Sequence, residues 1–164
     1  MTLPEQERER FCQVLHHSRT SLYRLAFSIT RNSSDAQEAV AEAVCRAYER
    51  YPQLREKEKL PWWLLKITAN EARRLCQRRG RTVSLDDLPT EPAIPGRETG
   101  DDTLWQAVQT LPRDQREAVV LFYYEDLPTE EIARIVGTSP GAVRVRLSRA
   151  REKLRSILKE GDYG

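Results

Sequence analysis

A stretch rich in proline and glycine interrupts the chain at residues 82–102 and limits how the chain can fold. The stretch contains Pro89, Pro92, Pro95, Gly96 and Gly100, and it has neither helical spacing nor strand alternation. Its acidic side chains predict an extended, negatively charged linker. No segment on either side alternates apolar and polar residues, so we expect an all-α protein with two small helical domains. We place these domains at residues 10–81 and 102–160, with the linker at 82–101.

The first domain shows helical character in three segments, Leu22–Ile29, Asp35–Tyr51 and Trp62–Arg79. The middle segment has the clearest pattern, because its apolar and small residues recur at the spacing of one helix face. Ser33 or Ser34 is placed to cap its first turn.

The second domain contains the pattern of a helix-turn-helix. Pro112 and Pro128 divide it into short helices that we expect at residues 102–109, 113–125 and 129–136. Gly137 then opens a three-residue turn, in which Ser139 is a typical N-cap and Pro140 suits the first helical position. A short helix, a turn with glycine and a longer helix together predict this motif.

The last helix carries a single apolar seam and many arginines outside it. At about 100° per residue, the seam falls within a stripe about 100° wide and consists of Val143, Leu147, Ala150, Leu154, Ile157 and Leu158. The opposite side presents Val145, Ser148, Arg149 and Glu152, and the flanks present Arg144, Arg151 and Arg155 on one side and Arg146 and Lys153 on the other. This arrangement suits the major groove of DNA, with base edges at the centre and phosphates at the flanks. The alternative is a solvated helix surface.

Two further charged surfaces are expected in the first domain. The helix at 35–51 places Asp35, Glu38, Glu42 and Glu49 away from its apolar stripe, which suits a basic protein partner. The segment from residue 62 combines aromatic, amide and basic side chains, namely Trp62, Trp63, Lys66, Asn70, Arg73, Arg74, Arg78, Arg79 and Arg81. Such a mixture suits unstacked single-stranded bases, although either tryptophan also suits the core.

Composition excludes several other classes of protein. The chain has 164 residues, of which 39% are hydrophobic and 32% are charged, and no apolar run approaches the roughly 18 residues of a membrane span. The N-terminal residues show no export signal, so we expect a cytoplasmic protein. Cys12, Cys45 and Cys76 form neither a disulfide framework nor a zinc pattern and are expected to be partly buried. We expect no metal, no cofactor and no small-molecule substrate.

Three segments resemble those of bacterial sigma factors of the extracytoplasmic-function (ECF) group. They are "LYRLAFSITRNSSDAQEAVAEAVCRAYERY", "WWLLKITANEARR" and "LPRDQREAVVLFYYEDLPTEEIARIVGTSPGAVRVRLSRAREKL". The resemblance covers nearly the whole chain. It implies sigma domain 2, a linker and sigma domain 4, in a protein that binds core RNA polymerase and directs initiation at promoters without a catalytic group of its own.

The resemblance also implies roles for single residues. It implicates Asp35, Glu38 and Glu42 in binding the clamp helices of the largest polymerase subunit, and the flap of the second-largest subunit as a further contact. It implicates the loop Gln53–Pro61 in holding a flipped base of the minus-10 element, with Lys59, Trp62, Asn70, Arg73, Arg74 and Arg78 as the minus-10 residues. For the minus-35 element it implicates Arg144, Val145, Ser148 and Arg149 at the bases and Arg146 and Arg151 mostly at phosphates, with Thr138 and Ser139 completing the site. An anti-sigma factor is the expected regulatory partner.

Two alternatives from other classes remain open at this point. The first is a stand-alone helix-turn-helix regulator, which leaves the acidic face and the basic segment after Trp62 without a role. The second is an enzyme that uses His16, His17 or a cysteine. Adjacent histidines cannot share one helix face. No acidic or nucleophilic residue lies at a sequence spacing from them that indicates a catalytic site.

Overall fold

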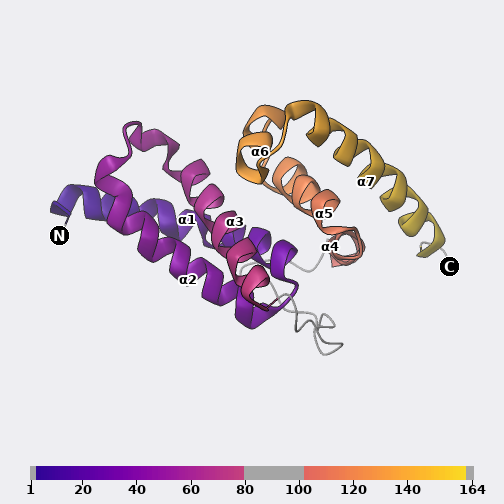
Figure 1. Cartoon of the computed structure of the whole chain (residues 1–164), viewed down its shortest axis with the longest axis horizontal. Coiled ribbons are helices and arrows are strands. Elements are labelled where there is room, and N and C mark those ends of the chain that lie inside the picture. Colours follow the sequence, from indigo (N-terminus) through magenta and orange to yellow (C-terminus); the bar gives the residue numbers. More distant parts are fainter. Residues whose placement is uncertain (1–2, 80–101, 162–164) are drawn as a thin grey trace. The chain divides into compact units, whose positions relative to one another are not determined.

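The computed structural model describes residues 3–79 and 102–161, and these residues form helices and turns with no strand among them (Figure 1). The predicted all-α class is thereby confirmed. The chain divides into two compact units, and the boundary between them falls within the predicted linker. The linker itself, residues 82–101, lies outside the described residues.

The first unit is a bundle of three helices joined by short turns. Its elements are α1 (Glu5–Thr30), α2 (Ser33–Arg50), the 3₁₀ turns η1 (Tyr51–Gln53) and η2 (Lys57–Lys59), and α3 (Leu60–Arg79). Each long helix packs against the other two. The buried positions of α2 are all alanine, namely Ala36, Ala39, Ala43 and Ala47. Such small side chains let α1 and α3 approach the backbone of α2 closely and supply the large apolar groups themselves.

Helix α1 is much longer than the segment Leu22–Ile29 that the sequence pattern predicted. Its first turns are polar, but they are held by Phe11, which is only 2% exposed. The ring of Phe11 packs edge-to-face on Tyr48 and on Tyr51, with ring centroids 5.4 Å apart in both pairs. Packing against a distant part of the chain therefore extends this helix, which periodicity alone did not predict.

The turn between α1 and α2 is closed by the left-handed backbone of Arg31 and by the side-chain amide of Asn32. Arg31 adopts a left-handed conformation, with φ of 55°, and its N–H donates to the carbonyl of Phe27 at 2.7 Å. Burial lowers the pKa of Arg31 below its usual value. The N-cap of α2 is Asn32, whose Oδ1 accepts a 2.9 Å hydrogen bond from the N–H of Asp35. The expected cap at Ser33 or Ser34 is therefore wrong, because the helix begins at Ser33.

The second unit contains α4 (Asp102–Gln109), α5 (Arg113–Val119), the π-helical turn η6 (Val120–Tyr124), α6 (Thr129–Val136) and α7 (Pro140–Gly161). The helix expected at 113–125 is thus an α-helix that ends in a wide π turn. The guanidinium of Arg116, only 5% exposed, donates a 2.6 Å hydrogen bond to the carbonyl of Leu111 and so joins α5 to the preceding turn.

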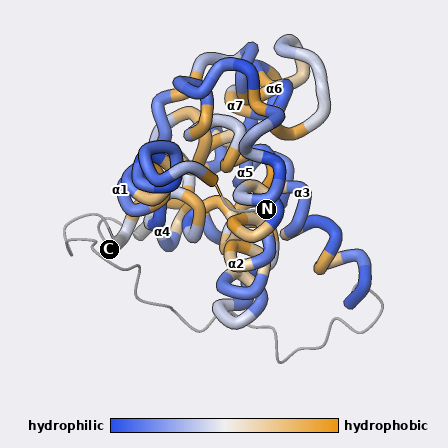
Figure 2. The backbone as a smooth tube through the Cα atoms, turned by 90° about the vertical axis from the view of Figure 1, so that its left-hand side faces the viewer, coloured by the Kyte–Doolittle hydropathy of each residue, from blue (hydrophilic) through white to orange (hydrophobic). Residues whose placement is uncertain are grey.

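The apolar seam of α7 faces the core of this unit, as predicted. Val143, Leu147, Ala150 and Leu154 are buried, and Ile157 and Leu158 are half-buried. In Figure 2 the hydrophobic stretches recur as short patches between hydrophilic ones along the helices, which is the pattern of helices that bury one side.

Among the described residues, the structure shows no cluster of three or more histidine, cysteine or acidic side chains able to hold a metal ion. The cysteines are free, but Cys12 and Cys45 are exposed and only Cys76 is half-buried. The expectation of partial burial is therefore wrong for the first two, which lie on outer faces of α1 and α2. No helix in the described part of the chain is long and apolar enough to cross a bilayer.

Candidate nucleic-acid and polymerase interfaces

The turn between α6 and α7 is set by Gly137. This residue has a φ of 78°, a left-handed conformation that favours glycine over residues with a Cβ atom. The N–H of Gly137 and the N–H of Thr138 both donate to the carbonyl of Ala133, at 2.8 Å and 3.0 Å. This closes α6 and turns the chain toward α7.

Ser139 caps α7, as the sequence predicted. Its Oγ accepts a 3.1 Å hydrogen bond from the N–H of Ala142, and its carbonyl accepts the N–H of Val143, also at 3.1 Å. The start of α7 is therefore fixed, which sets the direction in which its exposed side chains project.

The outer face of α7 presents the side chains that the sequence assigned to base reading. Arg144, Val145, Ser148 and Arg149 are all exposed. Val145 is 47% exposed and so offers an apolar group on this face. One helix face thus combines two arginines, a hydroxyl and an apolar group, which are the groups that contact base edges in the major groove.

The arginines assigned to phosphates have partners within the second unit. Nε of Arg146 lies 3.7 Å from Oδ2 of Asp114 on α5. Nε of Arg151 donates a 2.6 Å hydrogen bond to the hydroxyl of Tyr123, and its guanidinium lies 5.8 Å from the ring centroids of Phe122 and Tyr123. The helical projection predicted the directions in which these arginines point but not these neighbours.

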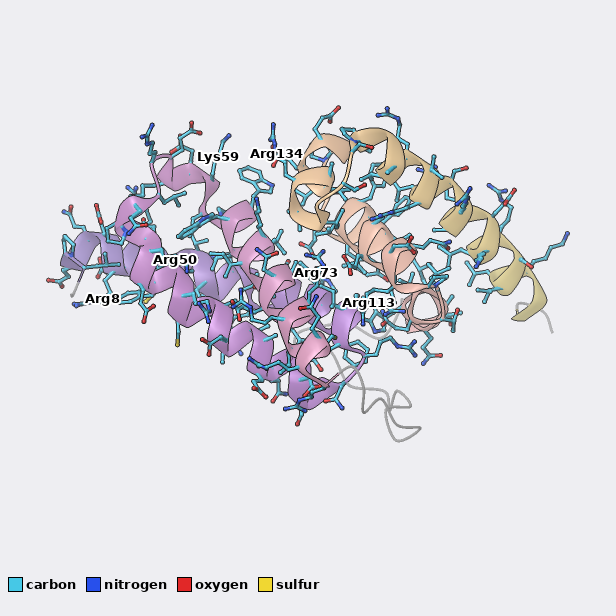
Figure 3. The ribbon with its side chains drawn as sticks, in the orientation of Figure 1. Arg8, Arg50, Lys59, Arg73, Arg113 and Arg134 are labelled. Carbon is cyan, nitrogen blue, oxygen red and sulfur yellow. The ribbon has the colours of Figure 1, made fainter. Side chains whose placement is uncertain are left out.

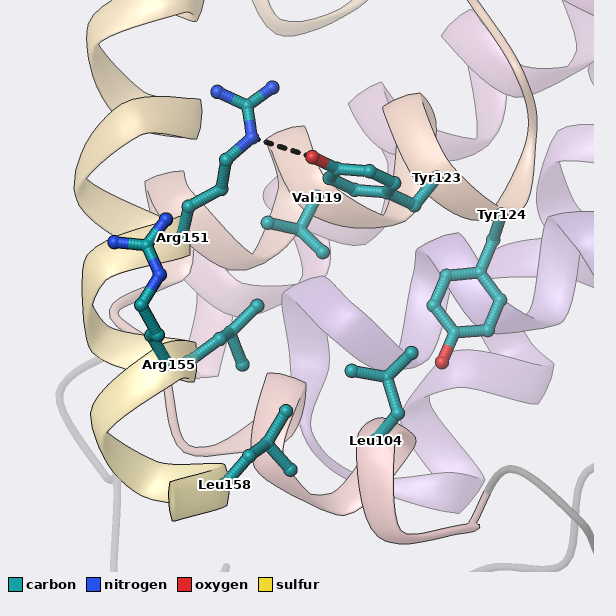
Figure 4. Close-up of a pocket in the computed structure, with 8 residues that line it drawn as sticks. Leu104, Val119, Tyr123, Tyr124, Arg151, Arg155 and Leu158 are labelled. Atoms are coloured by element: carbon teal, nitrogen blue, oxygen red, sulfur yellow. Dashed lines mark hydrogen bonds between the residues drawn. The ribbon is translucent and has the colours of Figure 1, made fainter.

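A groove with apolar walls lies beside Arg151 (Figure 4). It has a volume of about 300 Å³, and its lining includes Leu104, Val119, Tyr124 and Leu158, with Arg151 and Arg155 at its edge. This groove was not predicted from the sequence. Two residues of its lining, Leu104 and Tyr123, are 37% and 48% exposed, and their apolar or aromatic character is the sequence signal that marks it.

Helix α3 presents a stripe of polar and aromatic side chains. Trp62, Lys66, Asn70 and Arg73 fall within about 80° of one another around the helix. Trp62 is 38% exposed, Lys66 and Asn70 are exposed, and Arg73 is half-buried. Figure 3 shows Lys59 on the loop before α3 and Arg73 further along that helix. Lys66 lies within this stripe, although it was not among the residues expected to contact the minus-10 element.

Two arginines expected to contact the minus-10 element lie to one side of this stripe. Arg78 is exposed in the last turn of α3. Arg74 donates a 2.9 Å hydrogen bond to Oε2 of Glu71. Glu71 is only 7% exposed and also pairs with Arg46 of α2 at 2.8 Å. The two arginines compensate the buried carboxylate and join α2 to α3.

The acidic residues of α2 are held by arginines of the same unit. Asp35 pairs with Arg79 at 2.6 Å, and Glu38 lies 3.4 Å from the same guanidinium. Glu42 pairs with Arg46 at 3.4 Å. The side chains of Glu38 and Glu42 remain more than half exposed, at 53% and 54%, whereas that of Asp35 is 14% exposed. Glu38 and Glu42 therefore remain accessible on the outer surface of α2, as does Glu49.

Residues 14–82 match the description "Sigma-70 region 2", and residues 101–154 match "Sigma-70, region 4". The chain is 32% identical to the RNA polymerase sigma factor SigV of Bacillus subtilis over 142 residues, which cover 85% of this chain and 86% of SigV. It is also 32% identical to the ECF RNA polymerase sigma factor EcfG of Rhodopseudomonas palustris, over 84% of this chain and 79% of EcfG. The chain belongs to the ECF sigma factors.

A solved structure agrees with this assignment. The sigma factor RpoE, in its complex with the anti-sigma factor NepR from Bartonella quintana, superimposes with a TM-score of 0.76 and 26% identity. The match covers 95% of this chain and 98% of RpoE. This sigma factor therefore has the two helical regions of its family, and the stand-alone regulator is not favoured.

Proposed function

We propose that this ECF sigma factor uses three separate surfaces, the exposed face of α7, the stripe on α3 and the acidic face of α2, to join core RNA polymerase to a promoter. The observation that carries the proposal is that base-reading side chains are exposed on both units, on α7 and on α3, while α2 presents the exposed carboxylates Glu38 and Glu42 one turn apart. A regulator that binds only duplex DNA needs the first surface and neither of the others.

The face of α7 reads duplex DNA at the minus-35 element. Arg149 and Arg144 suit the acceptors of guanine, and the apolar Val145 suits the methyl group of thymine. Arg146 and Arg151 contact phosphates, and Thr138 and Ser139 lie at the start of α7, where backbone N–H groups also favour phosphate.

The loop Gln53–Pro61 and α3 capture the opened strand at the minus-10 element. Trp62 offers an exposed ring for stacking, Asn70 offers an amide for base edges, and Lys59 and Arg73 offer positive charge to the backbone. Arg74 and Arg78 contribute charge at the side of the stripe.

The acidic face of α2 binds the clamp helices of the largest polymerase subunit. Glu38 and Glu42 lie one turn apart and are exposed, so they offer two carboxylates to a basic surface. Asp35 is more buried and supports the start of this face through Arg79.

The groove beside Arg151 receives an apolar segment of the polymerase flap. Its walls are apolar, and its two arginines favour a segment that also carries an acidic side chain. All the residues that line this groove belong to the second unit.

An anti-sigma factor restrains the protein in the cytoplasm, and the catalysis of RNA synthesis belongs to core polymerase. The relative from Bartonella quintana was solved with an anti-sigma factor, which supports this partner for the present chain.

Run-off transcription with core polymerase and this chain alone tests the proposal. We expect transcripts from a pool of duplex templates randomised upstream of a common coding segment, with enrichment of two elements after sequencing. Core polymerase without the chain is the control. Transcription that requires another sigma factor, with this chain only raising or lowering it, would instead identify a stand-alone regulator.

A further inference from the structure

One contact in the loop before α3 has no role in the proposed function. Nζ of Lys57 donates a 2.6 Å hydrogen bond to the backbone carbonyl of Tyr51, six positions earlier in the chain. The same ammonium group lies 4.2 Å from the centroid of the Tyr51 ring. One side chain therefore closes the loop through a charge-assisted hydrogen bond and a cation–π contact.

Tyr51 is a rigid anchor for this contact. It is 0% exposed, and its ring packs edge-to-face on Phe11 of α1. Its carbonyl also accepts the N–H of Leu54 at 3.0 Å, so both Leu54 and Lys57 are tied to the same buried residue. Lys57 thus connects the middle of the loop to the core of the first unit.

A second side-chain contact in this loop restrains it more weakly. Lys59 pairs with Glu56 at 3.3 Å, but both side chains are more than half exposed, and such surface pairs contribute little. The backbone N–H of Lys59 bonds the carbonyl of Glu56 at 2.9 Å, which shapes the turn without fixing it to the core. The loop next becomes anchored at Leu60, which is 0% exposed.

We propose that Lys57 is a positioning residue for base recognition, because it holds the loop Gln53–Pro61 in the shape that accepts the unpaired minus-10 base. This inference rests on the proposed function of that loop. A loop that is ordered before binding pays no ordering cost when a base enters it, and it accepts one base shape better than others. Lys57 acts through the loop and does not contact the phosphate backbone.

The experiment uses the full chain assembled with core polymerase. A fluorescent single-stranded DNA pool, randomised over its central positions, is selected on the wild-type holoenzyme to give an enriched oligonucleotide. Binding of this oligonucleotide and of its single-base variants is then measured at several salt concentrations. Two quantities result: the ratio of the dissociation constants, which reports base discrimination, and the salt slope, which reports phosphate contacts.

Lys57→Met should lower the discrimination ratio about tenfold, equivalent to about 1.4 kcal/mol, with the salt slope unchanged. Lys59→Met is the matched variant in the same loop, and as a phosphate contact it should reduce the slope by about 0.7 and keep the ratio. Lys57→Arg should restore most of the discrimination, because a guanidinium both stacks on a ring and donates to a carbonyl. Lys57→Gln serves as a second neutral variant if Lys57→Met folds poorly by circular dichroism.

A Lys57→Met or Lys57→Gln holoenzyme with the wild-type ratio would overturn the inference. So would a reduced slope with an intact ratio, which would make Lys57 a direct phosphate contact, or an equal loss of affinity for every oligonucleotide, which would make it only a structural residue. A wild-type holoenzyme with no base preference on single strands would remove the loop's proposed function and this inference together. Wild-type preference that survives the loss of Lys57 would remove the inference alone.

Discussion

Nε of Arg151 donates a hydrogen bond of 2.6 Å to the hydroxyl of Tyr123, which joins α7 to the π turn η6 (Figure 4). In this arrangement the two terminal nitrogens of the guanidinium point away from Tyr123. Arg151 therefore lies at the boundary between the face of α7 proposed for DNA and the groove proposed for the polymerase flap. Its neighbour Arg149, two residues earlier, is exposed on the outer face.

Arg149→Ala should cost about 1–3 kcal/mol of binding free energy at the cognate minus-35 element, because it removes a charged contact with a base edge. Specificity at that position should relax. Arg151→Ala is the contrasting variant, and it should weaken binding to all duplex sequences alike. Titration of holoenzyme on cognate and scrambled upstream DNA measures both effects. Equal losses on the two DNAs for both variants would refute this division of roles.

Leu104→Asp should disrupt the docking of the flap in the groove of the second unit, because it places a charge on an apolar wall. Transcription that depends on the minus-35 element should fall, while binding of single-stranded minus-10 DNA by holoenzyme should persist. Thr103→Asp is the matched control, since Thr103 is the exposed neighbour and does not line the groove. Similar activities for the two variants would place the flap elsewhere.

Glu38→Lys combined with Glu42→Lys should abolish association with core polymerase, because it reverses the two exposed carboxylates of α2 that are proposed to bind the clamp helices. The helical fold should remain, since neither side chain is in the core. Glu5→Lys with Glu9→Lys provides a matched reversal on α1, also one turn apart and exposed. Co-purification with core enzyme is the measurement, and a folded α2 double variant that still co-purifies would contradict the assignment.

Glu71→Ala should lower the stability of the first unit by about 2 kcal/mol, because it removes a carboxylate that receives charge-assisted contacts from Arg46 and Arg74. A loss of this size lowers the Tm by roughly 8–16 °C in a unit of this length. Glu49→Ala on the exposed surface of α2 is the control. Thermal unfolding followed by circular dichroism tests this, and equal melting of the two variants would show that the ion pairs contribute nothing.

Asn70→Ala with Arg73→Ala should impair strand opening more than initial promoter binding, because the two side chains belong to the proposed stripe for unpaired bases. Closed complexes should form through the second unit, but permanganate should react poorly with thymines of the minus-10 element. A template already mismatched over this element should recover part of the activity, since the cost of unpairing has been removed. Wild-type opening of duplex promoters by the double variant would argue that α3 is only a structural helix.

Local sequence patterns predicted those parts of the molecule that local interactions determine. The helix-turn-helix, the cap at Ser139 and the buried seam of α7 all follow from residues within one or two turns of each other, and all are confirmed. The polar start of α1 was missed because Phe11 is held by rings about forty positions away in the chain. The contacts Arg151–Tyr123 and Lys57–Tyr51 were missed because a helical projection gives a direction and not a neighbour.

The π turn η6 places five residues, Val120–Tyr124, where an α-helical turn takes about four. The wider turn therefore contains one residue more than an α-helical turn would need between α5 and α6. We expect that a single-residue deletion inside this turn would let the α-helix continue and leave the helix-turn-helix in register. The same deletion would change which aromatic side chain stands beside Arg151, so the length of this segment can alter the groove proposed for the flap without altering the face of α7 proposed for DNA.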